Sequence, residues 1–108
     1  MPSAAPPPPR EAEVELRNRH GLHVRPATIF AREAMRFRSE VVVGGKGKEA
    51  NGKSILMLIQ LAVEFGDRLL IRAVGEDAED CVAALVALVE TRFGEEPAPE
   101  GTTTAGRN

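Results

Sequence analysis

The sequence predicts an α+β two-layer, open-faced sandwich, in which three helices cover one side of a four-stranded antiparallel sheet. Two observations carry this prediction. The elements read from the sequence follow the order β-α-β-β-α-β-α, with connections of hairpin length. The chain has 108 residues, of which 43% are hydrophobic, and this is enough for one domain with one modest core.

The first strand and the first helix are predicted from two different periodicities. Polar and apolar residues alternate over residues 13–17, as in a strand that buries one face. Pro26 is favoured in the first turn of a helix, where its missing N–H costs nothing, so Arg25 and Pro26 open the first helix. A broad apolar face follows and ends near Arg38.

A hairpin and a short helix are predicted in the middle of the chain. The β-branched segment 40–43 and the short segment 48–50 are strands, joined by a glycine-rich turn over residues 44–47. This turn is too short and wrongly placed for a phosphate-binding P-loop. Ser54 caps a helix that runs through about Ala62.

A fourth strand and a last helix complete the domain. Residues 67–74 form the strand, with Leu69, Ile71 and Ala73 on one face. Asp77 caps the helix that follows. The apolar face of that helix consists of Cys81, Val82, Leu85, Leu88, Val89 and Phe93.

Both ends of the chain are predicted to be disordered tails around a domain of residues 11–94. Residues 1–10 are rich in proline, which favours extended polyproline geometry and does not fit the interior of a helix. Residues 95–108 contain Pro, Gly, Thr and Glu without apolar periodicity.

Composition predicts a cytoplasmic protein. The single cysteine, Cys81, has no partner for an internal disulfide, which fits a reducing compartment, and we expect it to be a buried, inert thiol. No apolar run approaches the roughly 20 residues that a membrane span needs. The start of the chain has no apolar stretch typical of a secretory signal. We therefore expect neither membrane insertion nor secretion.

Charge is unevenly distributed along the chain, although the net charge is only −2. Residues 17–53 are basic and residues 64–100 are acidic. A basic half steers docking onto an acidic partner or binds nucleic acid, or its charges are simply solvated. With four Phe and neither Trp nor Tyr, the chain lacks the aromatic platforms of single-strand binders, and we expect no nucleic-acid partner.

The segment 20–27 carries the chemistry. Gly21 permits a sharp turn, and Pro26 fixes the start of the helix, so His23 lies at or just before the first helical turn. The free N–H groups and the dipole of a helix start favour an anion and disfavour a cation. We expect a neutral, nucleophilic imidazole that becomes the favoured anion when phosphorylated, with Arg25 contacting the phosphate. Taken alone, the motif also fits an exposed turn histidine.

Residues 21–27, Gly-Leu-His-Val-Arg-Pro-Ala, closely resemble the active-site segment of HPr, the histidine phosphocarrier family of the bacterial phosphotransferase system. A second family segment, residues 52–55, lies at the usual separation, and the order of elements is also the family's. The resemblance implies that His23 accepts a phosphoryl group on its δ nitrogen from phosphorylated enzyme I, the phosphoenolpyruvate-protein phosphotransferase. It then passes the group to an enzyme IIA domain in sugar uptake, with Arg25 stabilising the phosphate.

The resemblance further implies a relay component without cofactor or metal, most simply a monomer, that turns nothing over by itself. Two residues depart from the family pattern. Val24 replaces the usual Ala or Thr, and its bulk could alter access of the donor. His20 stands where relatives have residues such as Asn or Lys. His20 and His23 lack further ligands nearby, so we do not expect zinc.

Ser54 resembles the regulatory serine that HPr kinase/phosphorylase modifies in some bacteria. The alternative is an ordinary N-cap, worth about 1 kcal/mol, and the two roles are compatible. A regulatory module of a nitrogen-type branch, or one controlled through Ser54, is therefore the alternative function. The residues expected to contact partners are Val24, Lys53, Ile55, Leu56 and Ile59, with Arg25 and Lys48 at the rim, while Leu58, Leu61 and Ala62 are expected in the core.

Overall fold

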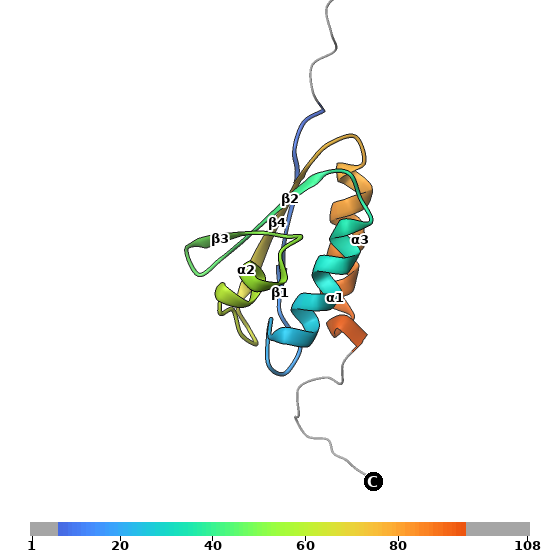
Figure 1. The fold of residues 1–108 in the computed structure, drawn as a ribbon. Coiled ribbons are helices and arrows are strands. Elements are labelled where there is room, and N and C mark those ends of the chain that lie inside the picture. The colour runs from blue at the N-terminus through green and yellow to red at the C-terminus, as the bar shows by residue number, and fades with distance from the viewer. Residues whose placement is uncertain (1–6, 95–108) are drawn as a thin grey trace, which may run out of the picture.

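The computed structural model describes residues 7–94 and confirms the predicted open-faced sandwich (Figure 1). The elements, in chain order, are β1 (Arg10–Glu15), α1 (Val24–Met35), β2 (Glu40–Gly45), β3 (Lys48–Asn51), α2 (Ile55–Gln60), β4 (Arg68–Val74), α3 (Ala78–Glu90) and a 3₁₀ turn, η1 (Arg92–Gly94). Residues 1–6 of the first predicted tail and all of the second, residues 95–108, lie outside the described residues. Arg10, which the sequence prediction places in the first tail, instead begins β1, because its backbone pairs with Ala73 of β4. No helix of the described part is long and apolar enough to cross a membrane.

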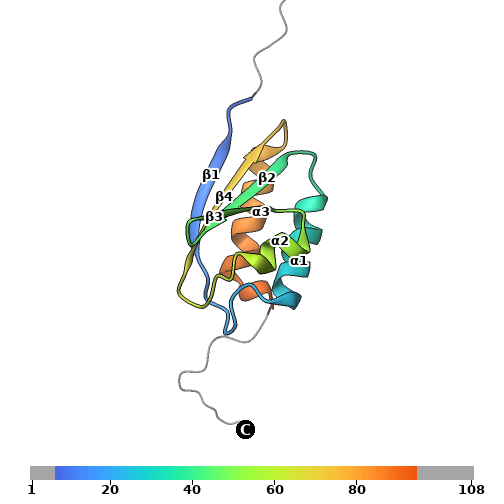
Figure 2. The same ribbon diagram turned by 60° about the vertical axis from the view of Figure 1, so that its left-hand side comes forward.

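The four strands are antiparallel and lie in the order β1-β4-β2-β3. The three α-helices lie on one face of this sheet and leave the other face open (Figures 1 and 2). Helices α1 and α3 run side by side across the sheet, while the short α2 contacts α1 and β3. This arrangement places the start of α1 and the whole of α2 at the same side of the domain.

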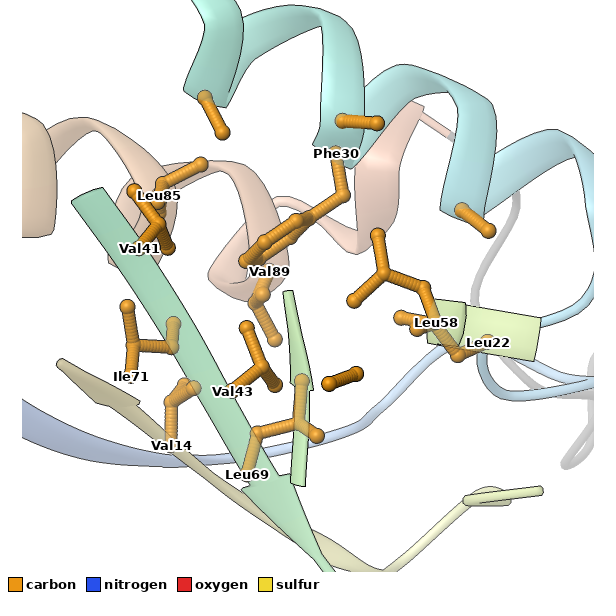
Figure 3. Packing of buried hydrophobic residues seen from close by; sticks show 14 of the residues in the cluster. Val14, Leu22, Phe30, Val41, Val43, Leu58, Leu69, Ile71, Leu85 and Val89 are labelled. Carbon is orange, nitrogen blue, oxygen red and sulfur yellow. The ribbon is translucent and has the colours of Figure 1, made fainter. Parts of the chain in front are cut away.

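The core lies between the sheet and the helices. The alternation predicted for the fourth strand is confirmed, because Leu69, Ile71 and Ala73 are all fully buried. Figure 3 shows Leu69 and Ile71 facing side chains from the helices, among them Phe30 of α1 and Leu58 of α2. Each large side chain that is fully buried contributes about 1.5–3 kcal/mol relative to exposure, so this layer supplies most of the stability.

The turn predicted over residues 44–47 is shorter in the structure. Gly44 and Gly45 belong to β2, and only Lys46 and Gly47 form the turn. A Cβ on Gly45 would lie 2.6 Å from Val63 Cγ1, so this glycine serves packing and not chain reversal.

Helix α2 is shorter than predicted. It ends at Gln60, with Leu61 as its C-cap. Ala62 has a φ of +58° and an exposed side chain, so the prediction that Ala62 belongs to the core is wrong. The left-handed backbone at this residue turns the chain away from the helix axis.

Asp77 is the N-cap residue of α3, but its side chain makes no capping hydrogen bond, contrary to the expected role. Its carboxylate instead accepts the Arg38 N–H at 2.8 Å, the Ser39 N–H at 2.9 Å and the Ser39 hydroxyl. The carboxylate thereby joins the entry to β2 to the start of α3. The Ser39 hydroxyl and then the Arg38 N–H hold the pKa of the Asp77 carboxyl below its usual value.

Asp77→Asn is expected to lower the melting temperature at neutral pH, because the charged acceptor is lost. Since folding lowers this pKa, the contribution is complete above the ordinary value of 3.8 and is lost as the pH falls through the folded value. Thermal unfolding followed by circular dichroism should therefore show a difference between wild type and variant that shrinks in acid. Asp80→Asn, in the exposed first turn of α3, is the matched control and should show little change.

Candidate active site

His23 is the N-cap residue of α1, at the place the sequence predicts. Its backbone is extended, with φ −87° and ψ −167°, and its carbonyl accepts the Ala27 N–H at 2.9 Å. The imidazole makes no capping hydrogen bond. The side chain is half-buried, and its Nε2 atom is enclosed by protein. The ring therefore stands at the helix start without serving as the cap.

The loop before His23 is fixed by Asn18 and Gly21. Asn18 is fully buried, and its side-chain amide donates to the Gly21 carbonyl at 2.6 Å. Gly21 has a φ of +65°, and a Cβ there would lie 2.4 Å from the Val63 carbonyl oxygen. The same carbonyl accepts the Leu22 N–H at 3.1 Å. The histidine loop is thus held against the segment that follows α2.

Asn18 is a site residue that the sequence analysis missed. Asparagine three residues before a glycine is a turn signal, because its side chain bonds readily to nearby backbone groups. That signal was present in residues 18–21, but nothing local showed that the amide would be buried.

The first turn of α1 offers two kinds of donor to an anion. The Ala27 N–H makes the first intrahelical bond and Pro26 has no N–H, so the N–H groups of Val24 and Arg25 precede the helical ladder. The side chain of Arg25 is exposed at this same turn. Thr28 donates its hydroxyl to the Val24 carbonyl at 2.7 Å, which strengthens the turn. An anion on the His23 ring would meet a favourable dipole and an adjacent guanidinium.

His20 lies next to His23. The two rings meet edge to face, with their centroids 5.5 Å apart and their planes at 90°. Within residues 7–94 there is no group of three or more His, Cys, Asp or Glu side chains that could hold a metal ion. The pair therefore offers two ring systems and no further ligand.

Helix α2 presents one apolar surface, which we call the α2 patch: Ile55, Leu56 and Met57. Leu56 is 64% exposed, and Val24 at the start of α1 is 63% exposed. Both ribbon views place α2 beside the N-terminal half of α1 (Figures 1 and 2).

The other apolar residues of segment 57–61 divide into buried and exposed side chains. Leu58 and Leu61 lie in the core, as predicted, and Ile59 is half-buried against it. Met57 is exposed but was not among the predicted contacts. A signal was available, because Met57 lies in the first turn of the short helix beside the two predicted residues.

Ser54 is the N-cap of α2, as predicted, and its Oγ accepts the Met57 N–H at 3.2 Å. The two lysines expected beside the patch both bond to backbone carbonyls. Lys53 Nζ donates to the Phe37 carbonyl at 2.8 Å, and Lys48 Nζ donates to the Gln60 carbonyl at 3.4 Å. Lys53 therefore connects the α2 cap to the chain just after α1.

Cys81 is fully buried on α3, as predicted. Burial, and then the negative charge of Asp77, raises the pKa of its thiol to about 11. The thiol is therefore protonated at neutral pH and belongs to the core rather than to the site.

The fold and the site together define a small open-faced α+β domain that presents a histidine at a helix start. Residues 10–91 match the PTS-HPr family, described as the PTS HPr component phosphorylation site, and the chain belongs to that family.

Its relatives include phosphocarrier protein HPr of Haemophilus influenzae, which is 46% identical over 79 residues, or 73% of this chain and 93% of that protein. HPr-like protein Crh of Bacillus subtilis is 41% identical over 80 residues, or 74% of this chain and 94% of that protein. The chain is also 41% identical over 87 residues to a multiphosphoryl transfer protein of Salmonella typhimurium. That match covers 78% of this chain and only 23% of the longer protein.

Among solved structures, HPr-C-His from Thermoanaerobacter tengcongensis superposes with a TM-score of 0.77 and 40% sequence identity. The match covers 81% of this chain and 98% of that one. The fold of this chain is therefore the fold of HPr.

Gly21→Ala is expected to destabilise the domain and to displace His23. A left-handed backbone costs an alanine about 1–2 kcal/mol, and the contact with the Val63 carbonyl adds to this cost. Gly47→Ala is the matched control, because Gly47 also has a positive φ but no atom within 4 Å of its Cβ position. Urea unfolding should show a larger loss for Gly21→Ala than for Gly47→Ala, and equal losses would contradict the packing argument.

Proposed function

We propose that this chain is a phosphocarrier, in which His23 accepts a phosphoryl group from phosphorylated enzyme I and passes it to an enzyme IIA domain in sugar uptake. One observation carries the proposal: the family's histidine segment forms the start of α1, with His23 as the N-cap residue. The partners and the sugar-uptake role come from the family resemblance.

The burial of Nε2 supports attack by the other ring nitrogen, Nδ1. A neutral imidazole that attacks through the Nδ1 lone pair carries its hydrogen on Nε2. The N–P bond of the donor breaks as the bond between Nδ1 and phosphorus forms, and the reverse exchange delivers the group to the acceptor. Because protein encloses Nε2, the phosphoryl donor approaches the ring from the side of Nδ1.

The start of α1 stabilises the phosphorylated state. The phosphoryl oxygens carry negative charge, which the first-turn N–H groups and the helix dipole favour by about 0.3–1 kcal/mol per charge. The Arg25 guanidinium adds planar, permanently charged donors. This stabilisation is modest because the start of α1 is exposed to solvent. A modestly stabilised phosphoryl group suits a carrier that must pass the group on.

Docking of both partners is assigned to Val24 and the α2 patch. Their apolar side chains lie beside the phosphoacceptor and are exposed in the absence of a partner. Small apolar surfaces with a basic rim suit brief contacts with acidic partners. Lys53 contributes to this surface by fixing the start of α2. Ile59 contributes by packing against the core beside the α2 patch.

A regulatory module is the second candidate function, and Ser54 is the observation that favours it. Ser54 lies directly before the α2 patch, so a phosphoryl group added there by an HPr kinase/phosphorylase would bring about −1.5 to −2 charge to the docking surface. The start of the helix favours this negative charge, whereas the charge disfavours an apolar contact between the α2 patch and a partner. Under both candidates we place the protein in the cytoplasm as a monomer, with its domain at residues 10–94.

Incubation with phosphoenolpyruvate and enzyme I is expected to add one phosphate to the purified chain, seen by intact mass. Brief acid treatment should remove it, because the N–P bond is acid-labile. His23→Ala should gain none. Arg25→Gln should slow the gain by about 10- to 100-fold, as expected for the loss of a charged hydrogen bond worth about 1.5–3 kcal/mol. An acid-stable phosphate, or a gain that persists in His23→Ala, would overturn the proposal.

Leu56→Glu is expected to raise the KM of enzyme I for this chain about tenfold, with little change in melting temperature, because it places a charge in the proposed contact. Leu70→Glu is the matched control: Leu70 is 42% exposed, but it lies in β4 and not on α2. Initial rates of phosphorylation at varied concentrations of the chain, with a fixed catalytic amount of enzyme I, give this KM. Equal KM values for the two variants would place the docking surface elsewhere.

A further inference from the structure

The turn before His23 is closed from inside the protein by the side chain of Asn18. This side chain is fully buried, and its amide donates to the Gly21 carbonyl at 2.6 Å. The Gly21 N–H in turn donates to the Asn18 backbone carbonyl at 3.3 Å. A buried amide is costly unless it is hydrogen-bonded, so the bond to Gly21 ties the burial of Asn18 to the shape of this turn.

Gly21 is the residue of the turn whose backbone has the most conformational freedom. Glycine adopts positive and negative φ with equal ease, and Gly21 has a φ of +65°. Both of its backbone polar groups bond to Asn18, the carbonyl to the side chain and the N–H to the backbone. Leu22, which follows, is buried and separately held by the Val63 carbonyl. Asn18 therefore restrains the part of the turn that glycine itself leaves free.

The position of Gly21 bears on the chemistry because His23 follows it by two residues and is the N-cap of α1. In the proposed transfer, the N–P bond of the donor breaks as the bond between Nδ1 and phosphorus forms. The N–H groups of Val24 and Arg25 then have to face the transferred group. A shift of the turn would move the imidazole relative to these N–H groups, and a misplacement of about 1 Å can slow such a reaction about 100-fold.

The α2 patch, the larger part of the proposed docking surface, has anchors in other segments of the chain. Leu58 holds α2 in the core, Ser54 caps it, and Lys53 bonds to the Phe37 carbonyl. Loss of the Asn18 amide leaves these three anchors in place. The turn and the docking surface can therefore be tested separately.

We propose that Asn18 is a positioning residue for phosphoryl transfer: through the Gly21 carbonyl, its buried amide holds the His23 imidazole where the start of α1 stabilises the transferred group. This inference rests on the proposed function, because it concerns the same transfer. Loss of the amide slows the transfer within the docked complex and leaves the affinity for the partner unchanged.

The test follows a single transfer from preformed phospho-enzyme I to an excess of the chain, at several concentrations of the chain. The limiting rate constant reports the step within the complex, and the concentration that gives half of this rate reports docking. Asn18→Leu removes the donor and keeps a side chain of similar size, whereas Asn18→Ala removes both. For each variant that circular dichroism shows to be folded, we expect the limiting rate constant to fall about 10- to 100-fold. The half-saturating concentration should change less than about twofold, because the anchors of α2 are intact.

Ile71→Val is the matched control, because it weakens the core at a fully buried position of β4 outside the site. Its limiting rate constant should equal that of the wild type. An equal loss of rate in Ile71→Val and in the Asn18 variants would show that transfer follows stability, and this would overturn the positioning role. An unchanged limiting rate constant, a rise in the half-saturating concentration alone, or failure of both Asn18 variants to fold would overturn it as well.

Failure of the proposed function would look different, since phospho-enzyme I would transfer no phosphate to the wild type. Phosphoramidate, a small chemical donor that needs no docking surface, would then replace phospho-enzyme I, with His23→Ala as the blank. Slower gain of phosphate by Asn18→Leu than by the wild type supports the inference, and equal rates overturn it. No gain by the wild type from either donor overturns both proposals.

Discussion

The close approach of Gly21 to the backbone after α2 is the constraint on which the site depends. A Cβ at Gly21 would lie 2.4 Å from the Val63 carbonyl oxygen, and that same carbonyl holds the Leu22 N–H. The buried Asn18 amide closes the loop from the other side. Because the chain turns so tightly here, His23 enters α1 in an extended conformation with its ring outside the helical ladder. A looser turn would leave the ring free to move away from the helix start.

At the start of α1, the residue that the core needs and the residue proposed to contact phosphate lie on different sides of the turn. Pro26 is buried and fixes the first turn, while Arg25 one residue earlier stays exposed. The core therefore uses one side of this turn and leaves the other side open for the proposed phosphate. An anion bound there would be accommodated without burying a charge, which would cost far more than exposed stabilisation provides.

Helix α2 likewise has one buried side and one exposed side. Leu58 anchors it in the core, and the residues of the α2 patch remain outside. Six residues are too few to be stable as an isolated helix, so the tertiary contacts hold it. The Ser54 cap and the Lys53 bond to the Phe37 carbonyl fix its beginning. The proposed docking surface is thus positioned by the same contacts that stabilise the fold.

The sequence by itself determined the order of elements, the buried face of β4, the cap at Ser54 and the position of His23 at a helix start. These features follow from local periodicity and backbone preference, which neighbouring residues express without help from the rest of the chain. Only the tertiary structure decided the partners of Asp77, the burial of Asn18 and the early end of α2. At Asp77, groups from a distant segment compete with the local ones. Asp77 gives up its helix cap because three donors at Arg38 and Ser39 reach it across the fold, and no local pattern encodes that meeting.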